Sequence, residues 1–345
     1  MPEFSKLVLT WFARHGRKDL PWQENKNPYR IWLSEIMLQQ TQVVTVIPYY
    51  LRFTSSFPNL NILSKASLDS VLEHWSGLGY YARARNLHKT SIYIKDHYDG
   101  HFPLDFDQLI DLPGIGRSTA GAILALSDNQ IYPILDGNVK RVLARYHAVK
   151  GWPGKKKVED QLWDIAKSHL PKMNIANYTQ AMMDLGATIC TRSKPRCSSC
   201  PLKQTCLAHS LGEENLYPTK KKDTPKPHRV TYVILLRNED KILMEKRPES
   251  GIWGGLYSLP ELDNKDDLER WIKERADCYP SKVTFKEDIR HVFSHYSLDI
   301  KPIEVRIASS FSKVKLRAVE SWVSKDSFDQ LGLAAPIKRL IKSIK

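Results

Sequence analysis

The sequence predicts two domains of different class, a mostly α-helical domain over residues 1–212 and an α+β domain over residues 230–345. A chain of 345 residues is longer than one hydrophobic core usually serves. Up to about residue 210, apolar residues recur at three- and four-residue spacing, which is typical of amphipathic helices. From residue 230 the segments become short, β-branched and roughly alternating, which is typical of strands. The intervening residues 213–229 carry three prolines and five basic residues, the composition of a linker.

Individual elements follow from the same periodicities. Helical spacing predicts helices that cover residues 28–41, 68–79, 82–98 and 157–170. Alternation predicts strands over residues 230–236, 241–247, 295–307 and 316–323, accompanied by helices near 265–276 and 335–344. The second domain is therefore expected to be α+β.

The charge of the chain favours a polyanionic partner. Its formal net charge is +14, and the basic excess is larger in residues 1–212 than in the C-terminal part. No apolar run is long enough to span a bilayer, and the N-terminus lacks the layout of a signal peptide. We therefore expect a soluble, intracellular protein that binds nucleic acid mainly through its N-terminal domain.

The most informative segment is LPGIGRSTAGAILAL (112–126) with the following ILDGNVKRVLAR (134–145). It predicts a helix, a glycine-rich hairpin and a second helix over about residues 107–127. Gly114 and Gly116 let backbone N–H groups approach an anion, and the second helix points its positive end at the same place. Asp136 is expected beside that anchor, at the start of a further helix. A phosphate clamp beside a carboxylate suggests chemistry on a nucleic acid.

Four cysteines crowd into residues 190–206 with the spacing C-x6-C-x2-C-x5-C, namely Cys190, Cys197, Cys200 and Cys206. In an intracellular chain such a cluster favours a metal site over disulfides. Structural zinc usually takes two close-spaced cysteine pairs, and this loop has one. Four thiolates in one loop also suit a [4Fe–4S] cluster. Between the first two cysteines, Arg192, Lys194 and Arg196 could hold phosphates.

In this order the hairpin, the aspartate-led helix and the cysteine loop resemble the helix-hairpin-helix DNA glycosylases of the endonuclease III superfamily. Within it they resemble the adenine DNA glycosylase (MutY) family, with WLSEIMLQQTQ (32–42) and GLGYYARARN (77–86) joining the match. The resemblance covers the whole chain. It implies a base excision repair enzyme that removes adenine opposite 8-oxoguanine or guanine in double-stranded DNA. It also implies a [4Fe–4S] cluster on the four cysteines; we further expect a monomer in the bacterial cytoplasm, associated with the nucleoid.

Two carboxylates of unlike pKa suit this reaction, because adenine leaves poorly without a proton donor and the sugar develops positive charge. Glu35 lies in a strongly apolar amphipathic helix, where burial should raise its pKa. By resemblance it protonates the adenine ring; otherwise it is an exposed helix glutamate. Asp136 is expected to stay ionised near cations and a helix N-terminus, and by resemblance it stabilises the sugar cation. A role as N-cap is compatible with this. Asn138 is expected to orient groups in the same site.

Position 118 divides the superfamily. Relatives that also cut the backbone carry a lysine there, which forms a Schiff base with the sugar. This chain has Ser118, and a hydroxyl cannot form an imine. The resemblance therefore implies a monofunctional glycosylase. We expect nearby Lys140 to contact phosphate.

Flipping adenine out of the duplex requires residues that fill the gap. By resemblance Gln40 lies beside the lesion and Tyr80 wedges into the stack next to the oxidised guanine. Core packing with a hydrogen-bonded hydroxyl is the alternative for either tyrosine of the pair, and it suits Tyr81. The adenine pocket is expected to draw on Trp22, Gln23 and Gln180, although some relatives have a cation where Gln23 stands.

The C-terminal domain resembles the Nudix hydrolase (MutT-like) fold, most clearly in RPESGIWGGLYSLP (247–260). The following DNKDDLERWIKERADC (263–278) lacks the REx2EE spacing that holds magnesium in those enzymes, so nucleotide hydrolysis is not expected. In the adenine DNA glycosylase family a Phe-Ser-His trio, here starting at Phe293, contacts 8-oxoguanine. The resemblance thus assigns lesion recognition to Ser294 and His295.

Three other functions agree less well with the sequence. An endonuclease III-like lyase is opposed by Ser118 and by the second domain. A non-catalytic DNA-binding protein is opposed by the retention of Glu35 and Asp136. A Nudix hydrolase is opposed by the missing glutamate helix.

Overall fold

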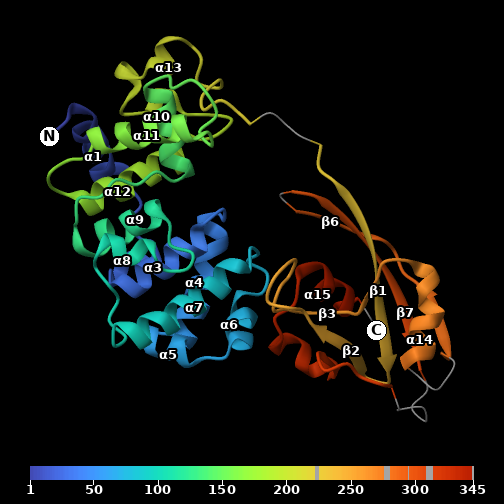
Figure 1. Cartoon of the computed structure of the whole chain (residues 1–345). Coiled ribbons are helices and arrows are strands. Elements are labelled where there is room, and N and C mark those ends of the chain that lie inside the picture. Colours follow the sequence, from blue (N-terminus) through green and yellow to red (C-terminus); the bar gives the residue numbers. More distant parts are fainter. Residues whose placement is uncertain (222–224, 276–279, 294, 308–313, 344–345) are drawn as a thin grey trace. The chain divides into compact units, whose positions relative to one another are not determined.

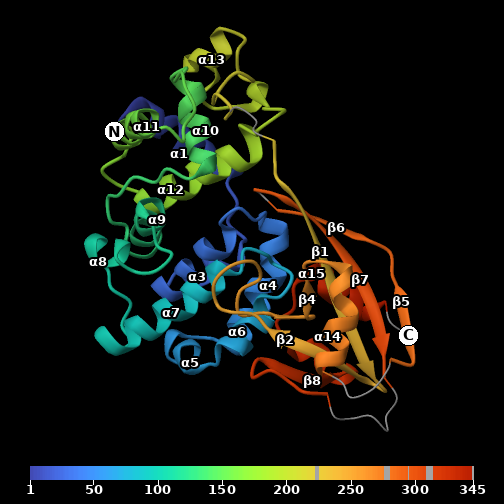
Figure 2. The same cartoon turned by 45° about the vertical axis from the view of Figure 1, so that its right-hand side comes forward.

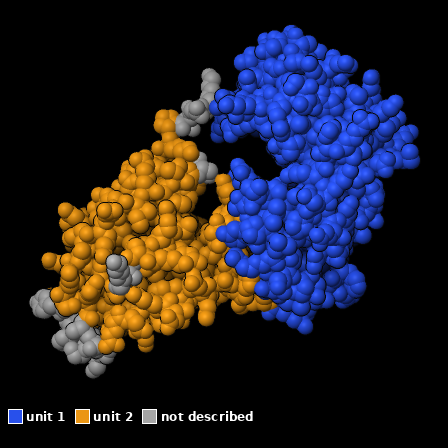
Figure 3. Space-filling view, turned by 180° about the vertical axis from the view of Figure 1, so that it is seen from behind, with its two compact units in different colours: residues 1–65, 86–223 blue, residues 66–85, 224–345 orange. Residues whose placement is uncertain are grey.

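The computed structural model describes residues 1–221, 225–275, 280–293, 295–307 and 314–343. These residues form two compact units (Figures 1 and 3). Unit 1 comprises Met1–Lys65 and Asn86–Asp223, and unit 2 comprises Ala66–Arg85 and Thr224–Lys345. Residues 66–85 lie inside the range that the sequence predicts for the helical domain, yet they pack with the C-terminal part of the chain.

Unit 1 is helical. Its longer α-helices are α1 (Glu3–His15), α3 (Pro28–Leu38), α4 (Val43–Ser56), α9 (Arg117–Asp128), α10 (Gly137–Tyr146), α11 (Lys156–Ser168) and α12 (Ile175–Asp184). Shorter elements are α2 (Pro21–Glu24), α5 (Leu60–Lys65), α8 (Phe106–Ile110), α13 (Leu207–Ser210), the π-helix η1 (Leu185–Ile189) and the 3-10 turns η2 (Cys197–Ser199) and η3 (Lys203–Thr205). Helix α7 (Ala82–His97) begins in unit 2 and continues in unit 1.

The core of unit 1 fixes the start of α10. Side chains from α1, α10, α11, α12 and η1 pack together and are fully buried, among them Val8, Leu143, Leu162, Ala181 and Leu185. Gly186 in η1 lets α10 approach closely, because a Cβ there would lie 2.5 Å from the Cβ of Asn138. Bulk at position 186 would therefore displace the N-terminus of α10, where Asp136 lies.

The predicted hairpin is present between α8 and α9. Gly114 has φ +81°, a left-handed conformation that favours glycine. The hydroxyl of Thr90 in α7 donates to the carbonyl of Pro113 at 2.9 Å and so ties the hairpin to its neighbour. Gly116 is the N-cap of α9, and no capping side chain accepts a hydrogen bond from the first N–H groups of that helix. The N-terminus of α9 is thus available to an anion.

In the part of unit 2 that the structure describes, eight strands form one sheet, with helices on both sides. The strands are β1 (His228–Asn238), β2 (Lys241–Lys246), β3 (Tyr257–Ser258), β4 (Glu261–Leu262), β5 (Lys282–Phe285), β6 (Ile289–Val292), β7 (Ser297–Arg306) and β8 (Glu320–Ser324). The main path runs β3-β2-β1-β7-β5; β4 pairs with β1, β6 with β7 and β8 with β2. The helical elements are α6 (Leu68–Trp75), α14 (Leu268–Arg275), α15 (Ala335–Lys342), η4 (Lys265–Asp267) and η6 (Lys325–Gln330).

The long parallel pair β1·β7 is the centre of this sheet (Figure 2), from His228 opposite Ser297 to Arg237 opposite Arg306. Among the described residues the other strand pairs are antiparallel, and an isolated parallel bridge joins Tyr257 to Leu333. Alternate residues of the two strands pack against Trp271 of α14, as the period-two pattern predicts. Helix α15 lies on the opposite side of the sheet (Figure 1).

Across the part of the chain that the structure describes, every helix is too short or too polar to cross a membrane.

Candidate active site

A cavity of about 810 Å³ in unit 1 brings together many of the predicted site residues. Its lining includes Trp22, Glu35, Gln40, Ser118, Asp136, Asn138 and Gln180. These residues come from α2, α3 and the turn after it, the hairpin helix α9, the start of α10 and α12, which are distant in sequence. Only the tertiary fold places the two carboxylates on one cavity.

Glu35 projects from the last turns of α3. The helix starts at Pro28 after Asn27, whose side-chain oxygen accepts a hydrogen bond from the backbone N–H of Arg30 at 2.8 Å. The neighbours of Glu35 along α3, including Ser34 and Ile36, are buried, whereas Glu35 keeps partial exposure at the cavity. Protein atoms nevertheless crowd its carboxyl. This desolvation, reinforced by the charge of Asp136, raises the pKa of Glu35 to about 8.

Asp136 is the N-cap of α10. Its Oδ1 accepts the backbone N–H of Val139 at 2.8 Å, and its Oδ2 accepts the side-chain amide of Asn138 at 3.1 Å. Burial raises the pKa of Asp136, while these hydrogen bonds and the charge of Arg141 lower it. The sequence predicts that cations and the helix N-terminus keep Asp136 ionised; Arg141 and the Val139 N–H do lower its pKa, but burial outweighs them and the net shift is upward.

A chain of hydrogen bonds leads from Asp136 toward the cysteine loop. Asn138 Oδ1 accepts from Arg141 Nη2 at 2.9 Å, and Arg141 Nε donates to the carbonyl of Cys190 at 2.6 Å. Arg141 also donates to the carbonyl of Gly186 at 2.6 Å. Sequence reasoning missed Arg141. Its position three residues after Asn138, on the same face of α10, was the available signal.

Ser118 lines the cavity and has a structural partner. Its hydroxyl oxygen accepts the backbone N–H of Leu135 at 2.9 Å, just before Asp136 in sequence. The serine therefore fixes the segment that carries the aspartate. Lys140, expected to contact phosphate, forms a 2.7 Å ion pair with Glu159 of α11.

The residues predicted to hold adenine separate into two groups. Trp22 and Gln180 line the 810 Å³ cavity and also a neighbouring cavity of about 490 Å³, whereas Gln23 lines only the second. The Gln23 amide donates to the carbonyl of Arg17 at 3.1 Å and accepts the N–H of Leu20 at 3.2 Å. Gln23 is thus a backbone brace in this structure.

Arg17, which lines the same cavity as Trp22 and Gln180, forms an ion pair with Asp184 that the sequence did not indicate. Asp184, fully buried in α12, accepts Arg17 Nη2 at 2.6 Å and Nε at 2.9 Å. It also accepts the amide of Gln180 at 2.9 Å. Spacing of four residues on α12 puts Gln180 and Asp184 on one face. The pair fixes the orientation of Gln180.

The four predicted ligand cysteines line one small cavity in unit 1, together with Arg145, His209 and Glu214. Burial and Glu214 raise the pKa of Cys197 to about 11, and burial raises that of Cys200 to about 12; the neighbouring cysteines add smaller increases to both. Arg145 donates to Cys190 Sγ at 3.3 Å and to the carbonyl of Thr191 at 2.7 Å. Crowded thiols that disfavour one another's ionisation are suited to a bound metal cluster, whose positive charge would compensate thiolates. A second donor set, Cys197, His209 and Glu214, also converges within 4.8 Å.

The remaining predicted residues lie in unit 2. Tyr80 is 49% exposed, whereas Tyr81 is buried with a hydrogen-bonded hydroxyl, as expected for core packing. His295 lies beside Tyr296, with ring centroids 4.8 Å apart. Ser294 lies outside the described residues.

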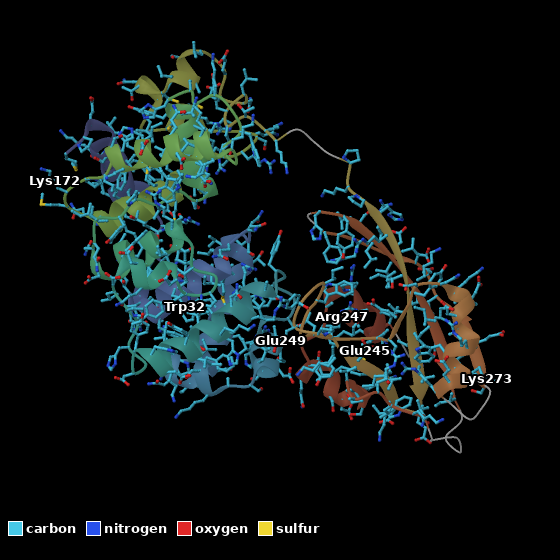
Figure 4. The ribbon with its side chains drawn as sticks, viewed as in Figure 1. Trp32, Lys172, Glu245, Arg247, Glu249 and Lys273 are labelled. Atoms are coloured by element: carbon cyan, nitrogen blue, oxygen red, sulfur yellow. The ribbon has the colours of Figure 1, made fainter. Side chains whose placement is uncertain are left out.

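Helix α14 lies within residues 263–278, the segment that lacks the magnesium-binding glutamate spacing of Nudix hydrolases. Trp271 packs on the sheet, and Arg275 makes a buried ion pair with Glu320 at 2.5 Å. Lys273 is exposed and points away from the sheet (Figure 4). This helix therefore contributes a packing face and an internal ion pair.

Comparisons with known proteins agree with this architecture. Residues 33–168 match the model of the HhH-GPD superfamily of base excision DNA repair proteins, and residues 231–343 match that of the NUDIX domain. A solved thermostable thymine-DNA glycosylase is 25% identical, with a TM-score of 0.54 over 60% of this chain and 95% of its own. An endonuclease III–DNA complex gives a TM-score of 0.52 at 22% identity, over 61% of this chain and 94% of the other. The predicted fold class is confirmed.

Relatives that align over nearly the whole of this chain include proteins named adenine DNA glycosylase. The adenine DNA glycosylase of Buchnera aphidicola subsp. Acyrthosiphon pisum (strain APS) is 43% identical over 99% of this chain and 97% of its own. The human adenine DNA glycosylase is 29% identical over 98% of this chain and 73% of its own. The chain therefore belongs to the adenine DNA glycosylase family, DNA-binding base excision repair enzymes that hydrolyse N-glycosyl bonds.

Proposed function

We propose that this protein removes adenine paired with 8-oxoguanine, and also adenine paired with guanine, from double-stranded DNA without cutting the backbone. One observation carries the proposal: Glu35 and Asp136 face the same cavity, which Ser118 also lines. The enzyme acts as a monomer, in the bacterial cytoplasm with the nucleoid.

Glu35 is the general acid. With a pKa of about 8 its carboxyl holds a proton at neutral pH. That proton goes to a ring nitrogen of adenine as the bond between C1′ and the base breaks, and the bonding electron pair leaves with the base. Protonation turns a poor leaving group into a good one.

Asp136 stabilises the sugar cation that remains. Its carboxylate is held by Val139 N–H and by Asn138, so little reorganisation is needed when charge develops. Water then adds to C1′, and its proton passes to the ionised Glu35, which restores the acid. Asn138 and Arg141 position Asp136.

The backbone is spared because position 118 offers no amine. Backbone cleavage by a lyase requires an imine between a lysine and C1′. The Ser118 hydroxyl is instead engaged by Leu135 N–H. The product is an intact abasic strand.

DNA is held by several elements. Gly114 and Gly116 present the hairpin N–H groups to phosphate, assisted by Lys140 and by exposed Arg192 at the cavity. Trp22, Gln23 and Gln180 form the surroundings of the flipped adenine, Gln23 by supporting Arg17 and Leu20. On the opposite strand, the lesion is read by Gln40, Tyr80, Ser294 and His295.

Cys190, Cys197, Cys200 and Cys206 hold a [4Fe–4S] cluster. When bound, such a cluster supplies four iron–thiolate bonds that fix residues 190–206. Arg192 and Arg196 are on this loop, so ordering it presents cations to DNA. Iron and inorganic sulfide analysis of anaerobically purified protein should give four of each per chain; stoichiometric zinc without sulfide would contradict this assignment.

A duplex assay tests the proposed activity. Adenine is placed opposite 8-oxoguanine, guanine or thymine, and the products are resolved with and without alkali. We expect strand breaks only after alkali, fastest for 8-oxoguanine, with Glu35→Gln as the inactive control. Nicking without alkali, or covalent trapping by borohydride, would overturn the monofunctional mechanism. Equal rates for all three pairs would overturn the substrate assignment.

A further inference from the structure

The segment Ala66–Arg85 is part of unit 2, although it is flanked in sequence by helices of unit 1. It contains α6 and the loop Gly77–Tyr81, which displays Tyr80 to solvent. Two hydrogen bonds from this loop region converge on one backbone carbonyl near the chain's C-terminus. Ser76 Oγ donates to the carbonyl of Leu333 at 3.0 Å, and the Tyr81 hydroxyl donates to the same oxygen at 3.3 Å.

Contacts on both sides of the loop fix the segment. Arg85 Nη1 donates to the carbonyl of Gly254 at 2.8 Å, and Lys246 forms a 2.7 Å ion pair with Asp69 of α6. Both side chains of this ion pair are partly exposed, so the pair contributes little to stability. The convergent hydroxyl bonds are the better-shielded contacts, since Tyr81 is only 9% exposed.

Glycines allow α6 to approach this closely. A Cβ at Gly255 or at Gly332 would lie 3.2 Å or 3.1 Å from side-chain atoms of Leu72. Leu72 is fully buried, so α6 packs tightly against this part of unit 2. This packing brings Ser76 and Tyr81 up to the carbonyl of Leu333.

The loop between these contacts holds an unfavourable backbone conformation. Gly77 and Gly79 have φ +98° and +78°, and Tyr80 itself has φ +50°, which costs a non-glycine residue about 1 kcal/mol or more. Such a conformation persists only where the surroundings enforce it. The Tyr81 hydroxyl accepts the N–H of Gly77 at 3.1 Å, and Arg83 Nη2 donates to the carbonyl of Gly79 at 3.1 Å.

We propose that Ser76 and Tyr81 are positioning residues that use the Leu333 carbonyl to hold Tyr80 in its exposed conformation. The Nudix-like fold thereby sets the residue that probes the base opposite adenine. This inference rests on the proposed role of Tyr80. A probe that is held in advance loses less conformational entropy on meeting the lesion.

The test uses full-length Tyr81→Phe, Ser76→Ala and the double variant, each made with and without Tyr80→Ala. Single-turnover excision is measured for adenine opposite 8-oxoguanine and opposite guanine. The matched control is Tyr29→Phe, which removes a buried hydroxyl that donates to the carbonyl of Phe57 at 2.6 Å in unit 1. We expect the double variant to lose about three- to tenfold of its preference for 8-oxoguanine, the effect of one or two hydrogen bonds. The control should keep the preference.

The double-mutant cycle separates positioning from general destabilisation. If Ser76 and Tyr81 act through Tyr80, their substitution causes no further loss of preference in Tyr80→Ala protein. An equal loss with and without Tyr80, or a parallel fall of both excision rates, would overturn the inference.

Amide hydrogen exchange in the free protein tests the same contact without DNA. Exchange across residues 77–83 should accelerate in the double variant and remain unchanged in Tyr29→Phe. Unchanged exchange would refute the bracing. If the unmodified enzyme showed no preference for 8-oxoguanine, the proposed function would fail, whereas exchange would still decide the bracing.

Discussion

Glu35→Gln should stabilise the protein increasingly as pH rises, while abolishing excision. The carboxyl of Glu35 is crowded by protein atoms and faces Asp136, so its ionisation is unfavourable in the folded chain. Its pKa is about 8 when folded and 4.5 in a solvated chain. Between these values the folded protein keeps a proton that the unfolded chain has released. Stability therefore falls with rising pH, and glutamine removes that dependence.

The magnitude follows from the two pKa values. Each pH unit between 4.5 and about 8 contributes about 1.4 kcal/mol to the difference between variant and unmodified protein. The difference should be near zero at pH 4.5 and reach about 5 kcal/mol above pH 8, as an upper value. This is a large part of the about 5–15 kcal/mol that stabilises a typical domain.

Urea unfolding followed by circular dichroism at a helix wavelength measures the effect, because most helices belong to unit 1. Both proteins are compared at pH 5, 6.5 and 8. The control is Glu24→Gln, because Glu24 of α2 is exposed. The free energy of unfolding of this variant should change with pH in the same way as that of the unmodified protein. If the free energy of unfolding of Glu35→Gln also changed with pH as it does in the unmodified protein, the argument that burial keeps Glu35 protonated would be refuted.

Three further variants test other parts of the site. Asp136→Asn should abolish excision but retain duplex binding in a gel-shift assay; lost binding would indicate a structural cap alone. Ser118→Ala leaves the N–H of Leu135 unpaired and should cost about 1–3 kcal/mol in urea unfolding, with strand breaks still dependent on alkali. Gly121→Ala places a Cβ 2.6 Å from the carbonyl oxygen of Pro133 and should lower the thermal midpoint; an unchanged midpoint would show that this backbone yields easily.

Periodicity predicted most of the fold because local patterns encode it. The segment 28–41 reads as an amphipathic helix, and α3 occupies Pro28–Leu38. The alternation over residues 295–307 becomes β7, at Ser297–Arg306. The sequence could not assign residues 66–85 to unit 2, because the helical period of α6 says nothing about which core receives it.

The candidate site divides in the same way. Motif and resemblance pointed to Glu35, Asp136 and Ser118, which the structure brings to one cavity, and to the four cysteines, which line another. The braces were missed: Arg141 between Asn138 and Cys190, and Asp184 beneath Gln180. Their partners are distant or reached through backbone carbonyls, which carry no sequence signature.

By itself the sequence determined the classes of the two domains, the hairpin, the spacing of the four cysteines and the absence of an amine at position 118. Those properties follow from side-chain type and local period. The tertiary structure determined the environments of the two carboxylates, Glu35 and Asp136. It crowded Glu35 enough to raise its pKa to about 8, and it gave Asp136 a raised pKa despite its hydrogen bonds. Desolvation depends on atoms brought together from many elements, so the fold alone sets it.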